Sequence, residues 1–341
     1  MEKYYILKLL GGGTFGKVYK CKNKGTKEIV AIKMVPVDFI DTEQYRNFIV
    51  ELHILSHHKC KYIVDFYNIY FERDILYYVL EYCNKGTLRN LINTLRENND
   101  TLNEYKIWDY FLQLICGMKY LHDNNVVHRD LKTQNILINN ETIKICDFNT
   151  AKILRKKTDA TNTFVGSLYY LSPELVHNEY YTNKIDIWAL GCILYEMLFL
   201  NYAFNYKGMG KIIISIGNID YKKIPDKLLL IYSPRIVGYI DKLVCKNRPS
   251  IEELIDDKII KIKMAQYGIY YEFRNDNIYP PQSTLYPKSS NEFKGIINNF
   301  YKEYSVDYTN SKHPCLYLDR NLIVNKMLLH SYKGKINLKK N

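Results

Sequence analysis

The chain has 341 residues, which is enough for one large domain or for two small ones. Hydrophobic residues make up 47% of it and charged residues 25%, as is usual for a soluble globular protein. Its 48 Lys and Arg against 36 Asp and Glu give a net charge of +12, half of it beyond residue 262. Because no five consecutive residues are basic, we expect a solvated basic surface and no nucleic-acid partner.

The spacing of the cysteines and the lack of long apolar segments indicate the cellular compartment in which the protein resides. Eight cysteines are scattered without a C-x-x-C pair, which argues against a zinc site or a disulfide framework and favours a reducing compartment. The N-terminus has no apolar core long enough for a signal peptide. The most apolar helix, around residues 187–204, contains Glu196 and is too short to cross a bilayer. We expect a cytoplasmic or nuclear protein without a membrane span.

The first 82 residues predict short strands and one helix. A helix is expected over 42–56, with Asp41 or Thr42 as its N-cap and apolar Phe48, Leu52 and Leu55 on one face. Strands are predicted on both sides of this helix, since short apolar runs alternate there with Gly-rich or polar turns. Their ranges are 5–10, 17–22, 29–34, 62–71 and 75–82.

After Asn84-Lys85-Gly86 the pattern changes to long helices. Apolar residues recur at helical spacing over 103–124 and 183–200, and more weakly over 207–216, 234–244 and 251–260. Beyond residue 262 we expect two further helices, over 291–304 and 318–331, but no heptad pattern persists that would predict a coiled coil.

A glycine-rich segment near the N-terminus is typical of a phosphate-binding hairpin. Residues 11–18 satisfy G-x-G-x-F-G-x-V, and glycines let a backbone lie over phosphates without Cβ collisions. Lys33 follows in Val30-Ala31-Ile32-Lys33 and would neutralise phosphate charge. Taken singly, the glycines are more often an ordinary turn, and Lys33 is as often a surface lysine. Glu51, eighteen residues after Lys33 on the predicted helix, favours the functional interpretation because it can pair with Lys33.

A second polar segment contains three oxygen-bearing side chains. Asp130 and Asn135 lie five positions apart in His128–Asn135, and Asp147 follows Asp130 by seventeen positions, in Asp147-Phe148-Asn149. Set between two apolar stretches, these side chains can converge on a substrate hydroxyl and on magnesium held by nucleotide phosphates. The segment matches the catalytic-loop and metal-loop signatures of protein kinases, and this resemblance implies phosphoryl transfer from ATP with Mg²⁺.

Together these motifs resemble the protein kinase domain over residues 4 to about 262, and within it the NIMA-related (NEK) serine/threonine kinases. The NEK resemblance rests on 128–136, 166–174 and 184–192. It implies an α+β, two-lobed kinase fold, with an antiparallel-sheet N-lobe that has one helix and a mainly helical C-lobe. The implied kinase domain spans 1–262 (N-lobe 1–80, hinge 81–86, C-lobe 87–262). Residues 263–341 would be a basic C-terminal extension of unknown role.

The resemblance also implies roles for individual residues. Asp130 would orient the substrate hydroxyl, Lys132 would offset charge on the transferred phosphoryl group, and Asn135 and Asp147 would bind metal. Lys33, held by Glu51, would contact the nucleotide phosphates. The adenine would bond to backbone groups of Glu81 and Cys83, and it would lie between Val18, Ala31 and Leu137. The remaining nucleotide-binding residues would be Gly11, Gly12, Gly13, Thr14, Phe15, Gly16 and Lys17.

The segment between Asp147 and Glu174 is the expected regulatory element. Arg129 and Lys152 would leave positive charge that needs an anion, which predicts phosphorylation by an upstream kinase at Thr163, with Thr161 as second choice. Ser167 would bond to Asp130 and Lys132.

Two pairs in the helical part are expected to be structural. Glu174 would pair with Arg248, and Asp186 would anchor the backbone of the catalytic loop.

Three departures from the family pattern matter. Asn149 replaces the glycine of Asp-Phe-Gly, and since Asn tolerates positive φ better than most residues, we expect metal binding to persist with a biased loop transition. Ser167-Leu168 replaces the usual Thr-Pro and alters the peptide-binding floor. The missing coiled coil leaves dimerisation open.

The sequence as a whole favours a serine/threonine kinase that uses Mg-ATP on protein substrates, in cell-cycle, centrosome or microtubule processes by family analogy. The alternative from another class is a pseudokinase that binds nucleotide and serves as a scaffold. Loss of Lys33, Asp130, Asn135 or Asp147 would indicate it, but all four are present, and only Asn149 speaks for it.

Overall fold

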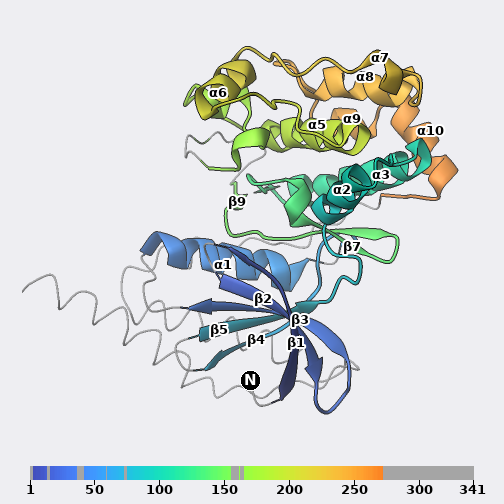
Figure 1. The fold of residues 1–341 in the computed structure, drawn as a ribbon. Helices are drawn as coiled ribbons and strands as arrows, with labels where there is room; N and C mark the ends of the chain where they lie inside the picture. Colours follow the sequence, from blue (N-terminus) through green and yellow to red (C-terminus); the bar gives the residue numbers. More distant parts are fainter. Residues whose placement is uncertain are drawn as a thin grey trace, which may run out of the picture. The chain divides into compact units, whose positions relative to one another are not determined.

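The computed structural model describes residues 3–13, 16–36, 42–58, 60–72, 75–154, 161 and 165–271. These residues form two compact units, one made of 3–56 and 64–82, the other of 57–63 and 83–271 (Figure 1). The predicted Thr14, Phe15 and Thr163 and the helices expected beyond residue 290 lie outside the described residues.

The first unit is a five-stranded antiparallel sheet with one helix, α1 (Thr42–His57), along one face (Figure 1). The strand order is β1-β2-β3-β5-β4. The strands are β1 Tyr4–Gly13, β2 Gly16–Asn23, β3 Ile29–Pro36, β4 Phe66–Glu72 and β5 Ile75–Glu81. This arrangement confirms the predicted N-lobe architecture.

The alternation of β3 divides its side chains between the two faces of the sheet. Val30 and Ile32 pack with Cys21 and Val79 in a buried cluster on one face. Lys33, one position out of phase, belongs to the opposite face. On that face α1 covers the sheet, where Phe48 meets the Tyr78 ring edge-on at 5.7 Å between centroids.

The second unit is mainly helical and is built around α3 and α5, which are buried along almost their whole length. Gly191 permits the close packing of α5 on α8, since a methyl group there would lie 2.8 Å from Leu243. The helices are α2 Leu88–Glu97, α3 Glu104–Asp123, α4 Pro173–Val176, α5 Lys184–Phe199, α6 Met209–Gly217, α7 Asp226–Leu229, α8 Pro234–Leu243, α9 Ile251–Ile255 and α10 Lys258–Tyr267.

Two short antiparallel ladders in this unit hold the polar segment predicted to be catalytic. Strand β6 (Val126–Val127) pairs with β9 (Lys152–Ile153), and β7 (Ile136–Asn139) forms a hairpin with β8 (Thr142–Ile145). The two catalytic motifs are therefore brought together by local pairing.

Three element predictions needed correction. The strand predicted from residue 62 begins at Phe66, because Tyr62 and Ile63 pair instead with Ile145 of the helical unit. The helix predicted over 251–260 is two helices, since Asp257 accepts bonds from the amides of Ile259 and Ile260 and starts α10. Helix α2 was not predicted.

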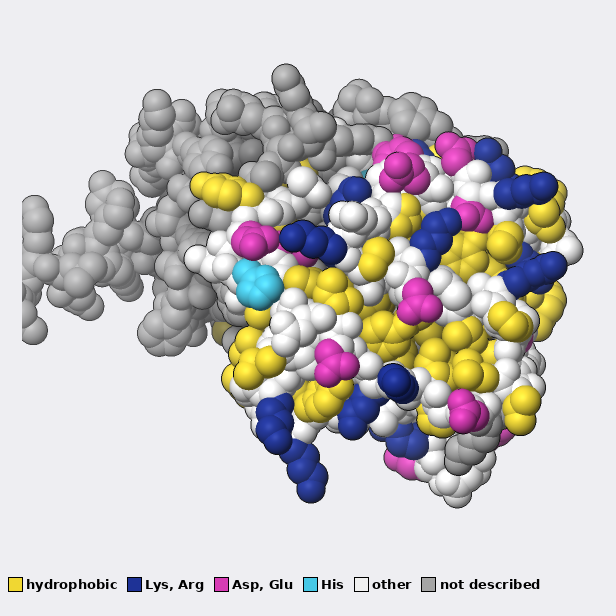
Figure 2. Space-filling model, turned by 90° about the horizontal axis from the view of Figure 1, so that it is seen from above, with side chains coloured by type: hydrophobic (Ala, Val, Ile, Leu, Met, Phe, Trp, Pro, Cys, Tyr) yellow, Lys and Arg dark blue, Asp and Glu magenta, His cyan; other side chains and the backbone are white. Residues whose placement is uncertain are grey.

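The described residues bear on two expectations from the sequence, a basic surface and the lack of a membrane span. In the face seen in Figure 2, Lys and Arg are interspersed with acidic and hydrophobic side chains and do not form one patch. Among the described helices, none is long and apolar enough to cross a membrane.

Candidate active site

Lys33 and Glu51 form a buried ion pair in the sheet unit. The Lys33 Nζ lies 2.8 Å from Glu51 Oε1, and the two side chains are 12% and 4% exposed. Strand β3 supplies the lysine and α1 supplies the glutamate. This is the contact that their separation of eighteen residues predicted.

The other predicted nucleotide residues of this unit lie around Lys33. Val18 of β2 is the register partner of both Gly11 and Lys33, so Val18 and Lys33 share a face of the sheet, and Ala31 shares it by alternation. Gly12, Gly13 and Lys17 lie at the end of the same hairpin. Gly16 has φ +148°, and a methyl group there would lie 2.1 Å from the Met34 carbonyl oxygen, so this position requires glycine.

Asp130, Lys132 and Ser167 form a closed triangle of hydrogen bonds in the helical unit. Lys132 Nζ donates to Asp130 Oδ2 at 2.5 Å and to Ser167 Oγ at 2.8 Å. Ser167 Oγ donates to Asp130 Oδ1 at 2.8 Å. Because both charged groups are tied to one hydroxyl, the segment after residue 165 fixes their positions.

The backbone of this loop is fixed by Asp186, as predicted. Its carboxylate accepts from the amides of His128 at 2.9 Å and Arg129 at 3.0 Å, and it lies 3.0 Å from His122 Nε2. Burial alone would raise the pKa of Asp186, but the bonds and charges of His122 and His128 prevail and lower it. Arg129 has φ +67°, a strained conformation that these bonds hold.

Asn135 and Asp147 lie at the same end of the β7–β8 hairpin. The Cys146 amide donates to the Asn135 carbonyl at 3.0 Å, which places Asp147 one residue from that bond. Asn135 Nδ2 donates to the Asp130 carbonyl at 2.9 Å, so its amide group is oriented with the nitrogen toward the catalytic loop. An amide and a carboxylate offer the oxygen donors that hard divalent cations prefer, and the two residues fit such a cation.

The structure corrects the argument that Asn149 is tolerated because asparagine can adopt a positive φ. In the segment 146–151 the left-handed residue is Asp147, at φ +66°, and Asn149 is not in that region. Asn149 and Thr150 instead occupy the centre of a turn closed by a 2.9 Å bond from the Ala151 amide to the Phe148 carbonyl. In this conformation, position 149 does not use the freedom of glycine.

A second group of cations lies beside the catalytic loop. Lys152 Nζ donates to Thr161 Oγ1 at 2.5 Å, and Arg129 donates to the Thr150 carbonyl and to the Tyr181 hydroxyl. Burial, and then the charge of Arg129, lower the pKa of Lys152. A buried cation, Arg129, and a half-buried one, Lys152, near one another favour an anion at this place.

The residues predicted for the adenine divide between the units. The Glu81 amide donates to the Asp65 carbonyl at 2.8 Å at the end of β5, and Cys83 begins the helical unit. Leu137 lies in β7, where it bridges to Thr87.

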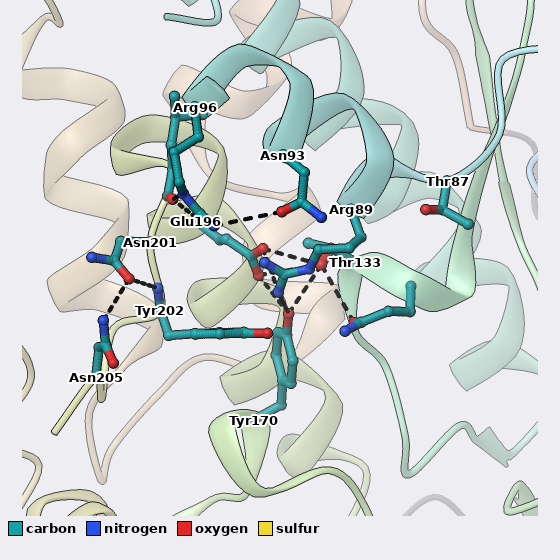
Figure 3. A network of polar contacts seen from close by, with 12 residues as sticks. Thr87, Arg89, Asn93, Arg96, Thr133, Tyr170, Glu196, Asn201, Tyr202 and Asn205 are labelled. Atoms are coloured by element: carbon teal, nitrogen blue, oxygen red, sulfur yellow. Dashed lines mark hydrogen bonds and ion pairs between the residues drawn. The ribbon is translucent and has the colours of Figure 1, made fainter. Parts of the chain in front are cut away.

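A buried polar network that sequence reasoning missed supports the catalytic loop (Figure 3). Glu196 of α5, fully buried, lies 2.5 Å from the Arg89 guanidinium of α2 and accepts bonds from the hydroxyls of Thr133 and Tyr170. The Arg89 guanidinium also lies 4.4 Å from the centre of the Tyr202 ring. Thr133 stands between Lys132 and Asn135, so the network links that loop to two helices.

The electrostatics of Glu196 reflect its burial. Burial raises the pKa of Glu196 to about 7, although Arg89 and the hydroxyls of Tyr170 and Thr133 act in the opposite direction. Glu196 is the one charged residue in the apolar stretch of α5 that follows Asp186, and this was the available signal, because a buried carboxylate needs partners.

Glu174 and Arg248 pair as predicted. Their side chains form an ion pair, and Arg248 also donates to the carbonyls of Lys184 at 2.8 Å and Cys245 at 2.9 Å. The pair ties the segment after Ser167 to the base of α5.

Comparison with known proteins agrees with this geometry. Residues 4–260 match the family described as "Protein kinase domain". The chain is 34% identical over 264 residues to "Probable serine/threonine-protein kinase nek3" of Dictyostelium discoideum, covering 75% of this chain and 23% of that protein. It is 32% identical over 270 residues to human "Serine/threonine-protein kinase Nek5", covering 78% and 38%. For "Probable serine/threonine-protein kinase nek2" of D. discoideum the identity is 32% over 283 residues, covering 80% and 66%.

The chain thus spans from 23% to 66% of the length of these three relatives. The match includes both units and each of the motifs described above. The chain belongs to the protein kinase domain family, and its relatives include the NEK serine/threonine kinases.

Proposed function

We propose that this chain is an active serine/threonine protein kinase that transfers the γ-phosphate of Mg-ATP to hydroxyl groups of protein substrates. The observation that carries the proposal is the triangle of Asp130, Lys132 and Ser167, with Asn135 bonded to the same loop and Asp147 next to Cys146, whose amide is bonded to Asn135. A carboxylate, a cation and a metal-binding pair in one fixed loop are what phosphoryl transfer requires.

Nucleotide binding is assigned mainly to the sheet unit. Lys33, oriented by Glu51, would neutralise phosphate charge, since the 2.8 Å bond restrains a side chain that is otherwise flexible. Residues 11–18 would cover the phosphates. Val18 and Ala31, with Leu137, would contact the adenine faces. Because the Glu81 amide donates to Asp65, we assign the adenine contact of Glu81 to its carbonyl and that of Cys83 to its amide.

Chemistry is assigned to the helical unit. Asp130 would accept the bond from the substrate hydroxyl and orient it for in-line attack, and Lys132 would offset the charge that develops on the transferred group. Asn135 and Asp147 would hold Mg²⁺, which when bound neutralises phosphate charge. The preference for serine and threonine acceptors is supported by Lys132, two residues after Asp130 as in serine/threonine kinases, and by the relatives named as such.

The scaffold alternative has less support. The four residues whose loss would indicate a pseudokinase are present, and each lies in an ordered contact. We therefore retain catalysis as the proposal. We also propose a cytoplasmic or nuclear location, supported by the eight scattered cysteines of the sequence, which form no C-x-x-C pair.

The direct test is transfer of radiolabelled phosphate to a generic protein acceptor, followed by phosphoamino-acid analysis. Wild type should label serine and threonine. Asp130→Asn should lower the rate by about 10³-fold or more, because a neutral amide cannot take up the proton of the substrate hydroxyl as a carboxylate can. Asp256→Asn, at an exposed carboxylate paired with the exposed Lys261, should leave it unchanged. Undiminished turnover by Asp130→Asn would refute the assignment.

Activation by an upstream kinase at Thr163 is also proposed, with Thr161 as second choice. Support comes from the cations Arg129 and Lys152, since the Thr161 hydroxyl already bonds to Lys152 and a phosphate there would make charge-assisted bonds. Phosphosite mapping of the active protein, with the activities of Thr163→Ala and Thr161→Ala, tests this. Full activity of both variants would contradict it.

A further inference from the structure

The side chain of Asn149 is bonded to a predicted metal ligand. Asn149 Nδ2 donates to Asp147 Oδ1 at 2.6 Å. Glycine, the usual residue of this motif, has no side chain with which to make that bond. The contact therefore belongs to the one position of the metal loop at which this chain departs from its family.

The backbone that carries Asn149 is fixed on both sides. Before it, the Cys146 amide is bonded to Asn135, and Phe148 is fully buried with its ring 5.1 Å from that of His128. After it, Thr150 Oγ1 donates to the His128 carbonyl at 3.3 Å. The Asn149 amide thus projects from an anchored turn and can restrain the carboxylate two residues away.

The geometry points to Asn149 as a positioning residue that orients the Asp147 carboxylate for its cation. The inference rests on the proposed function, because it assumes that Asp147 binds Mg²⁺ with a nucleotide. The bond occupies one oxygen of the Asp147 carboxylate and limits its rotation. The carboxylate is therefore already oriented when the cation binds. Hydrogen bonds to metal ligands commonly change metal affinity by about 10- to 100-fold.

The quantity to measure is the strengthening of nucleotide binding by Mg²⁺. Calorimetric titration of the full chain with ADP, in EDTA and in Mg²⁺, gives a ratio of the two dissociation constants. In Asn149→Gly and in Asn149→Ala, this ratio should fall about 10- to 100-fold, with binding in EDTA unchanged. Alanine removes the amide without adding backbone freedom, so it separates the hydrogen bond from chain flexibility.

Asn218→Gly is the matched control, since Asn218 is exposed at the end of α6 with φ −88°. It should keep the wild-type ratio. A loss confined to the glycine variant would overturn the inference, because flexibility would then be the cause. Tighter Mg²⁺-dependent binding in either Asn149 variant would also overturn it, since Asn149 would then compete with the cation.

The same titrations separate this inference from the proposed function. If wild type binds no ADP, or binds it with the same affinity in EDTA and in Mg²⁺, the proposed function fails. If wild type shows the strengthening and both Asn149 variants retain it, the proposed function stands and the role of Asn149 is refuted. Thermal unfolding of each variant verifies that it is folded.

Discussion

At the residue scale, the hydroxyl of Ser167 is the contact that joins the segment after residue 165 to the catalytic loop. It accepts from Lys132 and donates to Asp130, each at 2.8 Å. Serine was expected to replace the threonine of the family pattern at this position, and it keeps the hydroxyl. We infer that this hydroxyl, and not the lost methyl group, matters for orientation.

Ser167→Ala should lower kcat by about 10- to 100-fold, because Asp130 and Lys132 both lose the hydroxyl that orients them. Ser167→Thr should retain activity. Ser172→Ala is the control, since the buried Ser172 hydroxyl makes no hydrogen bond with any described residue and its removal should not destabilise the protein. Steady-state kinetics with a peptide acceptor measure the effect, and wild-type kcat in Ser167→Ala would exclude it.

Single residues were predictable where a motif fixes the partner. The pairs Lys33–Glu51 and Glu174–Arg248, and the bonds from Asp186 to the catalytic-loop backbone, were expected from the motifs and from the resemblance to the kinase family. The conformation of Asn149 was not, because its φ depends on the turn closed between Phe148 and Ala151 and on the bond to Asp147. The residue type limits which backbone conformations are possible, and the surrounding hydrogen bonds determine which of them the folded protein adopts.

At the element scale, α2 and α5 support the catalytic loop through Arg89 and Glu196 (Figure 3). Helix α2 was not predicted, although Thr87 and Asn90 form a capping box at its start, because its short sequence follows the polar turn at 84–86. The break between α9 and α10 was missed for a similar reason: apolar periodicity continues through Asp257, and only its capping bonds reveal two helices.

The raised pKa of Glu196 predicts a pH dependence of stability. Between pH 4.5, the ordinary value, and about pH 7 the unfolded chain has lost this proton while the folded protein retains it. The contribution to the free energy of unfolding is therefore full below this window and falls as pH rises through it. Its size is on the order of 3 kcal/mol.

Urea unfolding of wild type and Glu196→Gln at pH 5 and pH 8 tests this. The difference in unfolding free energy between pH 5 and pH 8 should be smaller in the variant, because glutamine does not titrate. Glu97→Gln, at the exposed end of α2, should behave like wild type. If the free energy of unfolding falls by the same amount from pH 5 to pH 8 in wild type and in Glu196→Gln, Glu196 is already ionised in the folded protein at pH 5.

At the scale of the whole molecule, the described fold continues beyond residue 262, where a boundary was predicted. Helix α10 runs through to Tyr267, whose ring stacks on that of Tyr105 at 4.6 Å. Ile269 is buried, and the Tyr271 hydroxyl donates to Asp123 of α3. Apolar periodicity could not set the boundary, because these contacts are made by residues far apart in the chain.

A chain that ends at residue 271 should fold, whereas one that ends at 262 should lose about 3 kcal/mol or more of unfolding free energy. The shorter chain lacks the buried side chains of Met264 and Ile269 and half of α10. Chemical unfolding of both chains beside the full chain measures the difference. Equal stability of the two truncated chains would show that the predicted boundary at 262 is sufficient.

The whole account depends on Lys33, in one unit, serving the reaction for which Asp130 and Asp147 lie in the other. The rate of phosphate transfer from radiolabelled ATP by Lys33→Met is the most direct measurement of this dependence. Lys22→Met serves as the control, at a lysine of β2 that makes no ion pair with a described residue. We predict a loss of about 10³-fold or more for Lys33→Met and none for the control. A Lys33→Met rate equal to wild type would contradict the account.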